Sequence, residues 1–230
     1  MFHDGDLLIE GERITGIGSA KKLGALSKVS TEIDAENHFV LPGFIDLQVN
    51  GAGGFLFTAE PTVRTLEIMS EVLARYGCTA FLPTVISTET ERITAALMAV
   101  NQAMRQGLPG AFILGCHIEG PFINSTEAGV HSVDTIRPPS LKEFSQWIDK
   151  ADGALKLLTI APELPGTAAL ITEARRCGVT VAAGHTTANY MQIMDAKKQG
   201  LGLVTHIFNA MGEMKSREPG TAGAALTMDD

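Results

Sequence analysis

Hydrophobic and polar positions follow two different patterns along this chain. Residues 6–20 alternate apolar and polar side chains around Glu10-Gly11-Glu12-Arg13, which predicts two short strands joined by a tight turn. From residue 41 onward, short β-branched runs alternate with amphipathic segments of helical length, a pattern typical of βαβ units and a parallel sheet. We therefore expect a small β domain segment at residues 1–40 and an α/β domain at residues 41–230.

The α/β region divides into predicted strands and helices. Strands are expected at residues 44–49, 80–83, 112–117, 155–160, 180–183 and 203–206, and helices at 62–76, 89–105, 141–149, 166–177 and 188–198. The sequence GAGG after the first strand lacks the GxGxxG spacing and the Lys-Ser/Thr pair of nucleotide-binding loops, so we interpret it as a glycine-rich loop. The pattern alone is compatible with a doubly wound sheet or with a barrel.

Composition narrows the class of protein. The chain has 230 residues, 45% of them hydrophobic and 19% charged, which is typical of a soluble globular protein without membrane partners. A formal net charge of −8 without a Lys/Arg cluster argues against a nucleic-acid partner. The opening MFHDGDLL does not resemble a signal peptide, so we expect a cytoplasmic location. Cys78, Cys116 and Cys177 are odd in number and outside any CxxC spacing, which predicts buried thiols.

Three candidate metal ligands each close a strand-like run: Glu119, His185 and His206. The carboxyl ends of neighbouring parallel strands lie at the same end of a barrel, so these side chains should lie together. One carboxylate and two imidazoles leave coordination positions open for water and substrate, as in a catalytic site. His117, two residues before Glu119, should face the same way one layer deeper and support the site.

Four segments, in this order, carry a family resemblance: LPGFIDLQVNGAGG, CHIEGPFINSTEAGVH, AGHTTANY and THIFNAMGEMKSREPGTAG. They resemble the N-acetylglucosamine-6-phosphate deacetylases of the amidohydrolase superfamily. The resemblance implies a partial TIM-like (β/α) barrel with about six of eight strands, plus a small N-terminal β segment. It also implies hydrolysis of the acetamido group of N-acetylglucosamine 6-phosphate to glucosamine 6-phosphate and acetate, in amino-sugar catabolism.

The resemblance further assigns residues to roles. Glu119, His185 and His206 would bind one divalent metal ion, with zinc as first choice and iron or manganese as alternatives. The phosphorylated, N-acetylated amino sugar would be bound by Val130, His131, Asn209, Ala210 and Arg217. The planar guanidinium of an Arg can donate paired hydrogen bonds to a phosphate. Alternatively, Arg217 could be a surface cation that pairs with Glu213 or Glu218.

The first strand departs from the superfamily pattern of two histidines. Gln48 and Asn50 share one strand face where His-x-His would stand, and because amides are weak ligands the substitution favours a single metal. We expect Gln48 and Asn50 to serve as polar packing beneath the site, and Asp46 to support the strand by hydrogen bonding.

The end of the sequence raises a question about activity. The resemblance places the catalytic Asp on an eighth strand beyond Asp230, and Asp229 and Asp230 follow the sixth strand too closely to replace it. We therefore expect a truncated chain that lacks deacetylase activity, and a homodimer for the full-length form. Two alternatives stay open: a non-catalytic relative that binds metal or sugar phosphate or serves as an interaction module, and an amidohydrolase acting on another N-acyl compound.

Overall fold

The computed structural model describes residues 5–23, 30–36 and 38–228, so Asp229 and Asp230 lie outside the described residues. The chain divides into two compact units, Met1–Pro42 and Gly43–Asp230. In the first unit, strands β1 (Asp6–Glu10) and β2 (Arg13–Gly18) pair antiparallel through a turn in which Gly11 has a φ of 61°, and helix α1 (Ala20–Leu23) follows. The predicted hairpin is confirmed.

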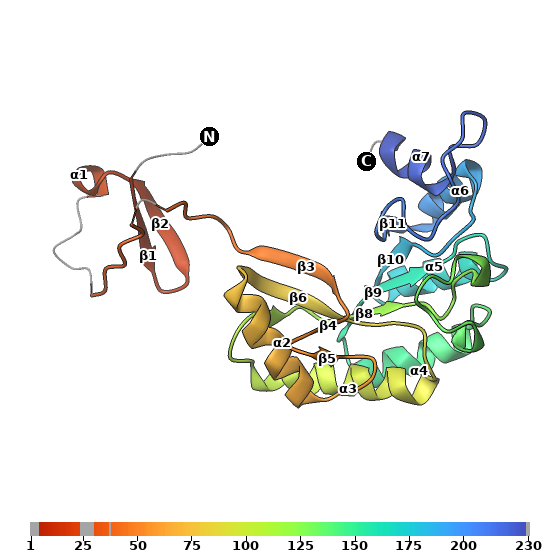
Figure 1. Cartoon of the computed structure of the whole chain (residues 1–230), viewed down its shortest axis with the longest axis horizontal. Helices are drawn as coiled ribbons and strands as arrows, with labels where there is room; N and C mark the ends of the chain where they lie inside the picture. Colours follow the sequence, from red (N-terminus) through yellow and green to blue (C-terminus); the bar gives the residue numbers. More distant parts are fainter. Residues whose placement is uncertain (1–4, 24–29, 37, 229–230) are drawn as a thin grey trace. The chain divides into compact units, whose positions relative to one another are not determined.

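The second unit is built on a parallel sheet that curls into a half-barrel (Figure 1). Its strands lie side by side in chain order: β3 (Phe44–Val49), β6 (Cys78–Val85), β8 (Cys116–Glu119), β9 (Leu155–Ile160), β10 (Thr180–Ala183) and β11 (Leu201–Val204). A doubly wound sheet reverses strand order at a switch point, whereas a barrel adds each new strand on the same side. The unbroken order therefore identifies the partial TIM-like barrel that the family resemblance implied, and excludes the doubly wound sheet that the pattern alone left open.

Helices connect consecutive strands of the sheet and pack against it (Figure 1). They are α2 (Val63–Arg75), α3 (Thr90–Gln106), α4 (Leu141–Ala151), α5 (Thr167–Arg176) and α6 (Tyr190–Gln199). Side chains of Thr62, Ser140 and Asn189 accept the first free amides of α2, α4 and α6, which fixes where these helices begin. No helix in the described part of the chain combines the length and apolar character needed to cross a bilayer.

The structure corrects several predicted elements. The strand expected at 112–117 is two strands, β7 (Phe112–Ile113) and β8, because Gly115 adopts a φ of 148° and a side chain there would meet the Ala154 carbonyl oxygen at 2.6 Å. The GAGG loop forms a small hairpin of β4 (Gly51–Ala52) and β5 (Phe55–Leu56). Helix α7 (Gly220–Thr227) and the 3₁₀ helices η2 (Ser125–Glu127) and η3 (Val133–Thr135) were not predicted.

The two faces of the curled sheet differ in chemistry. Alternate strand residues such as Phe81 and Leu158 face the helices and join a core that contains Phe122 stacked on Trp147, with ring centroids 5.2 Å apart. Cys78 and Cys116 are buried thiols as expected, but Cys177 at the end of α5 is only half-buried. The opposite face carries the polar residues of the candidate site, described below.

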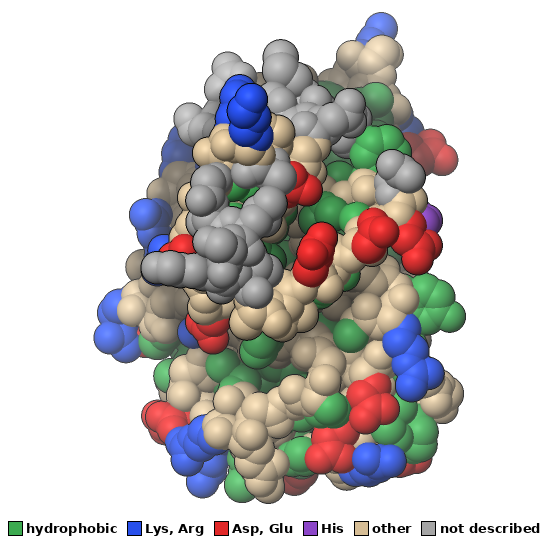
Figure 2. All heavy atoms as spheres, turned by 90° about the vertical axis from the view of Figure 1, so that its left-hand side faces the viewer, with side chains coloured by type: hydrophobic (Ala, Val, Ile, Leu, Met, Phe, Trp, Pro, Cys, Tyr) green, Lys and Arg blue, Asp and Glu red, His purple; other side chains and the backbone are tan. Residues whose placement is uncertain are grey.

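The surface carries charges of both signs. Figure 2 shows acidic and basic side chains interspersed over the face that it displays. With a net charge of −8, the protein offers an anionic substrate no general attraction. Binding of any anion would therefore depend on local groups.

Candidate metal centre

A buried chain of hydroxyl and imidazole groups crosses the inner face of the sheet. His117 on β8 contacts the Thr84 hydroxyl of β6 through Nδ1 at 3.2 Å and the Thr159 hydroxyl of β9 through Nε2 at 2.7 Å. Thr159 in turn contacts the Thr205 hydroxyl at 2.7 Å. Burial lowers the pKa of His117 to about 4, so its ring is neutral. Both ring nitrogens are engaged, and His117 therefore supports the layer above it, as expected.

Glu119, His185 and His206 lie in the layer above, at the carboxyl ends of β8, β10 and β11. Oε1 of Glu119 is 3.3 Å from Nε2 of His185 and 3.0 Å from Nε2 of His206, and the two nitrogens are 3.1 Å apart. Ligands of a tetrahedral metal at about 2.0–2.1 Å are separated from one another by about 3.3–3.4 Å. The spacing of these three atoms therefore fits one metal ion held between them.

The electrostatics of this trio favour a cation. Burial alone would raise the pKa of Glu119, but its contacts with His185 and His206 outweigh burial and lower that pKa well below its usual range. The carboxylate is thus ionised, the form that binds metals. The contact with Glu119 also raises the pKa of His206, because a carboxylate favours positive charge beside it. The negative charge of Glu119 would stabilise a bound divalent cation in the same way.

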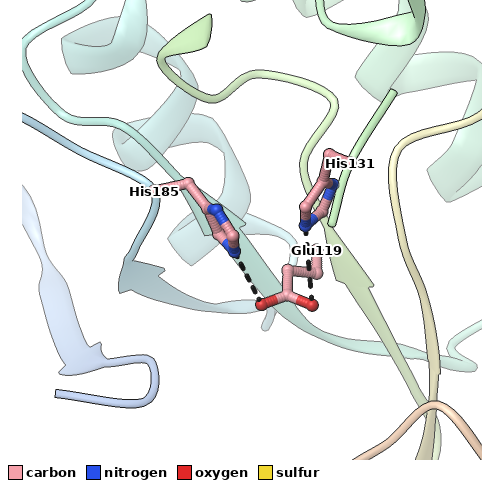
Figure 3. A group of neighbouring side chains, drawn as sticks. All are labelled: Glu119, His131 and His185. Carbon is pink, nitrogen blue, oxygen red and sulfur yellow. Dashed lines mark hydrogen bonds and ion pairs between the residues drawn. The ribbon is translucent and has the colours of Figure 1, made fainter. Parts of the chain in front are cut away.

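A third imidazole, that of His131, lies beside the site (Figure 3). Glu119, His131 and His185 offer ligand atoms within 4.8 Å of one another, and His131 Nε2 is 3.9 Å from Glu119 Oε2. His131 therefore has to be compared with His206 and His185 as a possible ligand. The hydrogen bonds of the rings distinguish them.

The partners of each Nδ1 atom fix the tautomers of His185 and His131. His185 Nδ1 lies 2.7 Å from the Glu127 carbonyl oxygen, which can only accept, so Nδ1 carries a hydrogen and, in the neutral ring that binds metals, Nε2 has the lone pair. His131 Nδ1 instead accepts the Ser87 backbone N–H at 3.1 Å, so its neutral ring carries the hydrogen on Nε2. Burial lowers the pKa of His131 to about 4, which keeps the ring neutral. In these tautomers the free edge of His131 offers a hydrogen-bond donor, whereas that of His185 offers a lone pair, which suits His185 better as a candidate ligand.

Gln48 on β3 contacts the same layer. Gln48 Nε2 donates to Glu119 Oε1 at 2.9 Å, so this amide orients the carboxylate and does more than the polar packing expected from the sequence. Asn50 Oδ1 is buried without a partner among the described residues. Asp46 Oδ1 accepts the Gln48 backbone N–H at 3.0 Å, in agreement with its expected supporting role.

Two of the proposed ligands have an unusual backbone conformation. The φ angles of His185 and His206 are 50° and 31°, in the left-handed region that L residues with side chains rarely adopt. Each such residue costs on the order of 1 kcal/mol and persists only where its surroundings hold it, which is common at functional sites. The strain therefore supports a functional role for both residues.

The expected substrate residues lie on loops around this layer. Val130 and Asn209 are exposed and Ala210 is half-buried, while Asn209 Nδ2 donates to the His206 carbonyl at 3.2 Å. A side chain at Gly129 would lie 3.3 Å from the His185 ring, so the loop that carries Val130 passes directly over the site. These positions leave the loop groups accessible to a bound sugar.

Arg217 is exposed and forms no hydrogen bond or ion pair with any other described residue. The alternative pairing with Glu213 or Glu218 is absent from the described part of the chain, and the Glu218 carboxylate instead accepts the Tyr190 and Gly220 amides at 2.8 and 3.0 Å. No described contact joins Arg217 to the metal trio. Its guanidinium is free to bind an anion.

Sequence reasoning missed the residues that orient the ligands. Ser87 lies two residues after β6, the same offset at which His185 and His206 follow β10 and β11. The offset appears only with the strand ends of the structure, because the predicted strands end at residues 83, 183 and 206, so the sequence carried no clear signal for Ser87. The Glu127 carbonyl had none, because any residue type supplies a carbonyl.

The half-barrel and its carboxylate–imidazole cluster define the class: a barrel protein with a Glu/His group that could bind a metal ion at the carboxyl ends of its strands. The chain belongs to the amidohydrolase family, whose family model matches residues 39–227. The recognition made from the sequence motifs is confirmed at this level.

Particular relatives refine the comparison. The chain is 36% identical to N-acetylglucosamine-6-phosphate deacetylase of Bacillus subtilis over 90% of this chain and 55% of that protein. It is 35% identical to N-acetylgalactosamine-6-phosphate deacetylase of Shewanella over 90% of this chain and 53% of that protein. The chain thus spans about half the length of the curated relatives it matches.

Solved structures agree in fold. The crystal structure of N-acetylglucosamine-6-phosphate deacetylase from Pasteurella multocida superposes with a TM-score of 0.88 at 33% identity, covering 97% of this chain and 57% of that one. A variant of the Mycobacterium smegmatis enzyme in complex with N-acetyl-D-glucosamine-6-phosphate superposes with a TM-score of 0.81 at 30% identity, covering 97% of this chain and 56% of that one.

Proposed function

We propose that the protein hydrolyses the acetamido group of N-acetylglucosamine 6-phosphate, giving glucosamine 6-phosphate and acetate. The observation that carries the proposal is the convergence of Glu119 Oε1, His185 Nε2 and His206 Nε2 within 3.0–3.3 Å of one another. Its setting is an amidohydrolase chain with deacetylases among its relatives. The nitrogen and oxygen donors suit zinc first, with iron and manganese as alternatives.

Each residue of the site then has a distinct task. A divalent metal held by Glu119, His185 and His206 would polarise the amide carbonyl and make water more acidic. His131 donates its Nε2–H toward the carbonyl oxygen as negative charge develops there, since this buried nitrogen has no hydrogen-bond partner among the described residues. Gln48 keeps the Glu119 carboxylate in place through its 2.9 Å hydrogen bond.

Substrate binding is assigned to the loops. Arg217 and Asn209, with the Ala210 backbone amide, bind the 6-phosphate, because a guanidinium fork and neutral donors suit a phosphate on an acidic protein. Val130 contacts the sugar through its backbone. No general base is assigned among the described residues.

The relatives also suggest a second substrate. Identities of 36% to an N-acetylglucosamine-6-phosphate deacetylase and 35% to an N-acetylgalactosamine-6-phosphate deacetylase are nearly equal. The two sugars differ only in the configuration of one hydroxyl, and both present the same amide and phosphate. The common substrate class is therefore an N-acetylated hexosamine 6-phosphate.

Acetate release by the purified protein tests the proposal. Both 6-phosphorylated sugars, unphosphorylated N-acetylglucosamine and an unrelated N-acyl amino acid should be compared with and without added zinc. We expect metal-dependent turnover of the phosphorylated sugars alone. Preferred turnover of the N-acyl amino acid would assign another amidohydrolase activity, and binding without turnover of any substrate would assign the non-catalytic alternative.

A further inference from the structure

One carboxylate beside the metal centre accepts four hydrogen bonds from two different loops. Glu163 follows β9, and its Oε1 accepts from Asn124 Nδ2 at 2.9 Å, from the Thr187 backbone N–H at 2.7 Å and from the Thr187 hydroxyl at 3.1 Å. Its Oε2 accepts from the Thr186 hydroxyl. Asn124 belongs to the loop after β8, whereas Thr186 and Thr187 directly follow the proposed ligand His185. Glu163 thus ties together the loops after β8, β9 and β10.

The same network also encloses His185. The Asn124 backbone N–H donates to the His185 carbonyl at 2.9 Å, and Asn124 Nδ2 donates to the Thr187 hydroxyl at 3.0 Å. The Asn124 side chain also caps η2, whose Glu127 carbonyl accepts from His185 Nδ1 at 2.7 Å. The backbone and the ring of His185 are therefore held from both sides.

The bonds are mutually consistent. The two hydrogens of the Asn124 amide go to Glu163 and Thr187, and the Thr187 hydroxyl accepts from Asn124 while it donates to Glu163. The Thr186 hydroxyl accepts the Ala188 backbone N–H at 3.0 Å while it donates to Glu163. A carboxylate satisfies all these donors at once, because its two oxygens only accept.

This network of hydrogen bonds can hold the strained backbone of His185 in place. His185 has a φ of 50°, so its backbone keeps this conformation only if the residues around it hold it there. A shift of this backbone would move His185 Nε2 away from Glu119 Oε1 and His206 Nε2. Ligand position in metal sites is commonly set by hydrogen-bonded partners of this kind.

We propose that Glu163 is a positioning residue for the metal centre. Glu163 holds the backbone at Thr186 and Thr187, so that the His185 imidazole faces Glu119 and His206. The inference rests on the proposed metal site and extends it to a residue that touches neither metal nor substrate. It predicts that metal affinity and coordination geometry depend on the hydrogen bonds of Glu163.

The test compares Glu163→Ala and Glu163→Gln. Both variants remove the same negative charge, but Gln retains an acceptor oxygen of the same shape, so the difference between them reports the hydrogen bonds. Glu173→Ala is the matched control, because Glu173 lies on α5 and its described side-chain contacts are with Arg176 and Cys177 alone. Zinc affinity is measured by competition with a chelator, and coordination geometry by the visible absorption of the cobalt(II)-loaded chain.

We expect Glu163→Ala to raise the zinc Kd about 10- to 100-fold and to alter the cobalt spectrum. Glu163→Gln should stay closer to the original chain in both measurements, and Glu173→Ala should match it. Equal effects of Ala and Gln, or an unchanged Kd in Glu163→Ala, would overturn the inference. If Glu163→Ala does not fold, Thr186→Val removes one of the four bonds and should raise the Kd severalfold, and no change would again contradict the proposal.

Failure of this inference can be distinguished from failure of the metal site itself. If Glu119→Gln binds zinc as well as the original chain does, the chain has no metal site of the proposed kind. A chain whose zinc binding needs Glu119 but is indifferent to Glu163 keeps the metal site and refutes only the positioning role.

Discussion

Removal of the Gln48 amide should weaken metal binding without touching a ligand. Gln48 Nε2 donates to Glu119 Oε1 at 2.9 Å, and a hydrogen bond to a charged group contributes about 1.5–3 kcal/mol. Gln48 lies half-buried on the edge strand β3, so the lower end of that range applies. Since about 1.4 kcal/mol corresponds to a tenfold change in affinity, Gln48→Ala should raise the zinc Kd about tenfold.

Asn50, a second amide that lies one residue beyond the end of β3, supplies the control. Asn50 Oδ1 has no described hydrogen-bond partner, so Asn50→Ala should leave the zinc Kd unchanged. Chelator competition with zinc at neutral pH measures both variants, and circular dichroism verifies that both are folded. An unchanged Kd in Gln48→Ala, or an equal loss in Asn50→Ala, would refute the orientation of Glu119 by Gln48.

Three further outcomes are expected. Arg217→Ala should weaken binding of N-acetylglucosamine 6-phosphate, measured by calorimetry, by about 2–3 kcal/mol, and an equal loss for the unphosphorylated sugar would contradict phosphate recognition. Burial alone would raise the pKa of Glu143, but Arg137 and Thr90 hold it below its usual range. The stability that Glu143 contributes is thus present above its unfolded pKa of about 4.3 and is lost as pH falls through the lower folded value, so urea unfolding should separate Glu143→Gln from the original chain at pH 7 but not in strong acid. A difference in unfolding free energy between the two proteins that does not change with pH would contradict this prediction. Trp147→Ala should lower the free energy of unfolding by about 3–5 kcal/mol, and a loss below about 1 kcal/mol would show that its stacking on Phe122 is unimportant.

Much of the α/β fold could be predicted from the sequence. β3, β9 and β10 occupy the expected residues, because runs of apolar β-branched residues between amphipathic helices are typical of parallel strands. Helix α7 was missed because its sequence GTAGAALT has almost no polar positions and therefore no helical periodicity. The pairing order that separates a barrel from a doubly wound sheet follows from tertiary structure alone.

The site was predictable only in part. Ligand candidates could be chosen because the ends of parallel strands converge, and the structure does bring Glu119, His185 and His206 together. The family resemblance assigned His185 to the metal and His131 to the sugar, but the tautomers that distinguish the two rings could not be predicted, since they depend on one backbone amide and one backbone carbonyl. Glu163 was likewise hidden, because its partners come from loops that are distant along the chain.

The central claim is that Glu119, His185 and His206 hold a single metal ion. Elemental analysis of the purified chain after equilibration with zinc tests it most directly, together with Glu119→Gln and with Glu173→Ala as a control of equal charge change. The account predicts one zinc per chain in the original and control proteins and its loss in Glu119→Gln. Two metals per chain, or an undiminished zinc content in Glu119→Gln, would contradict it.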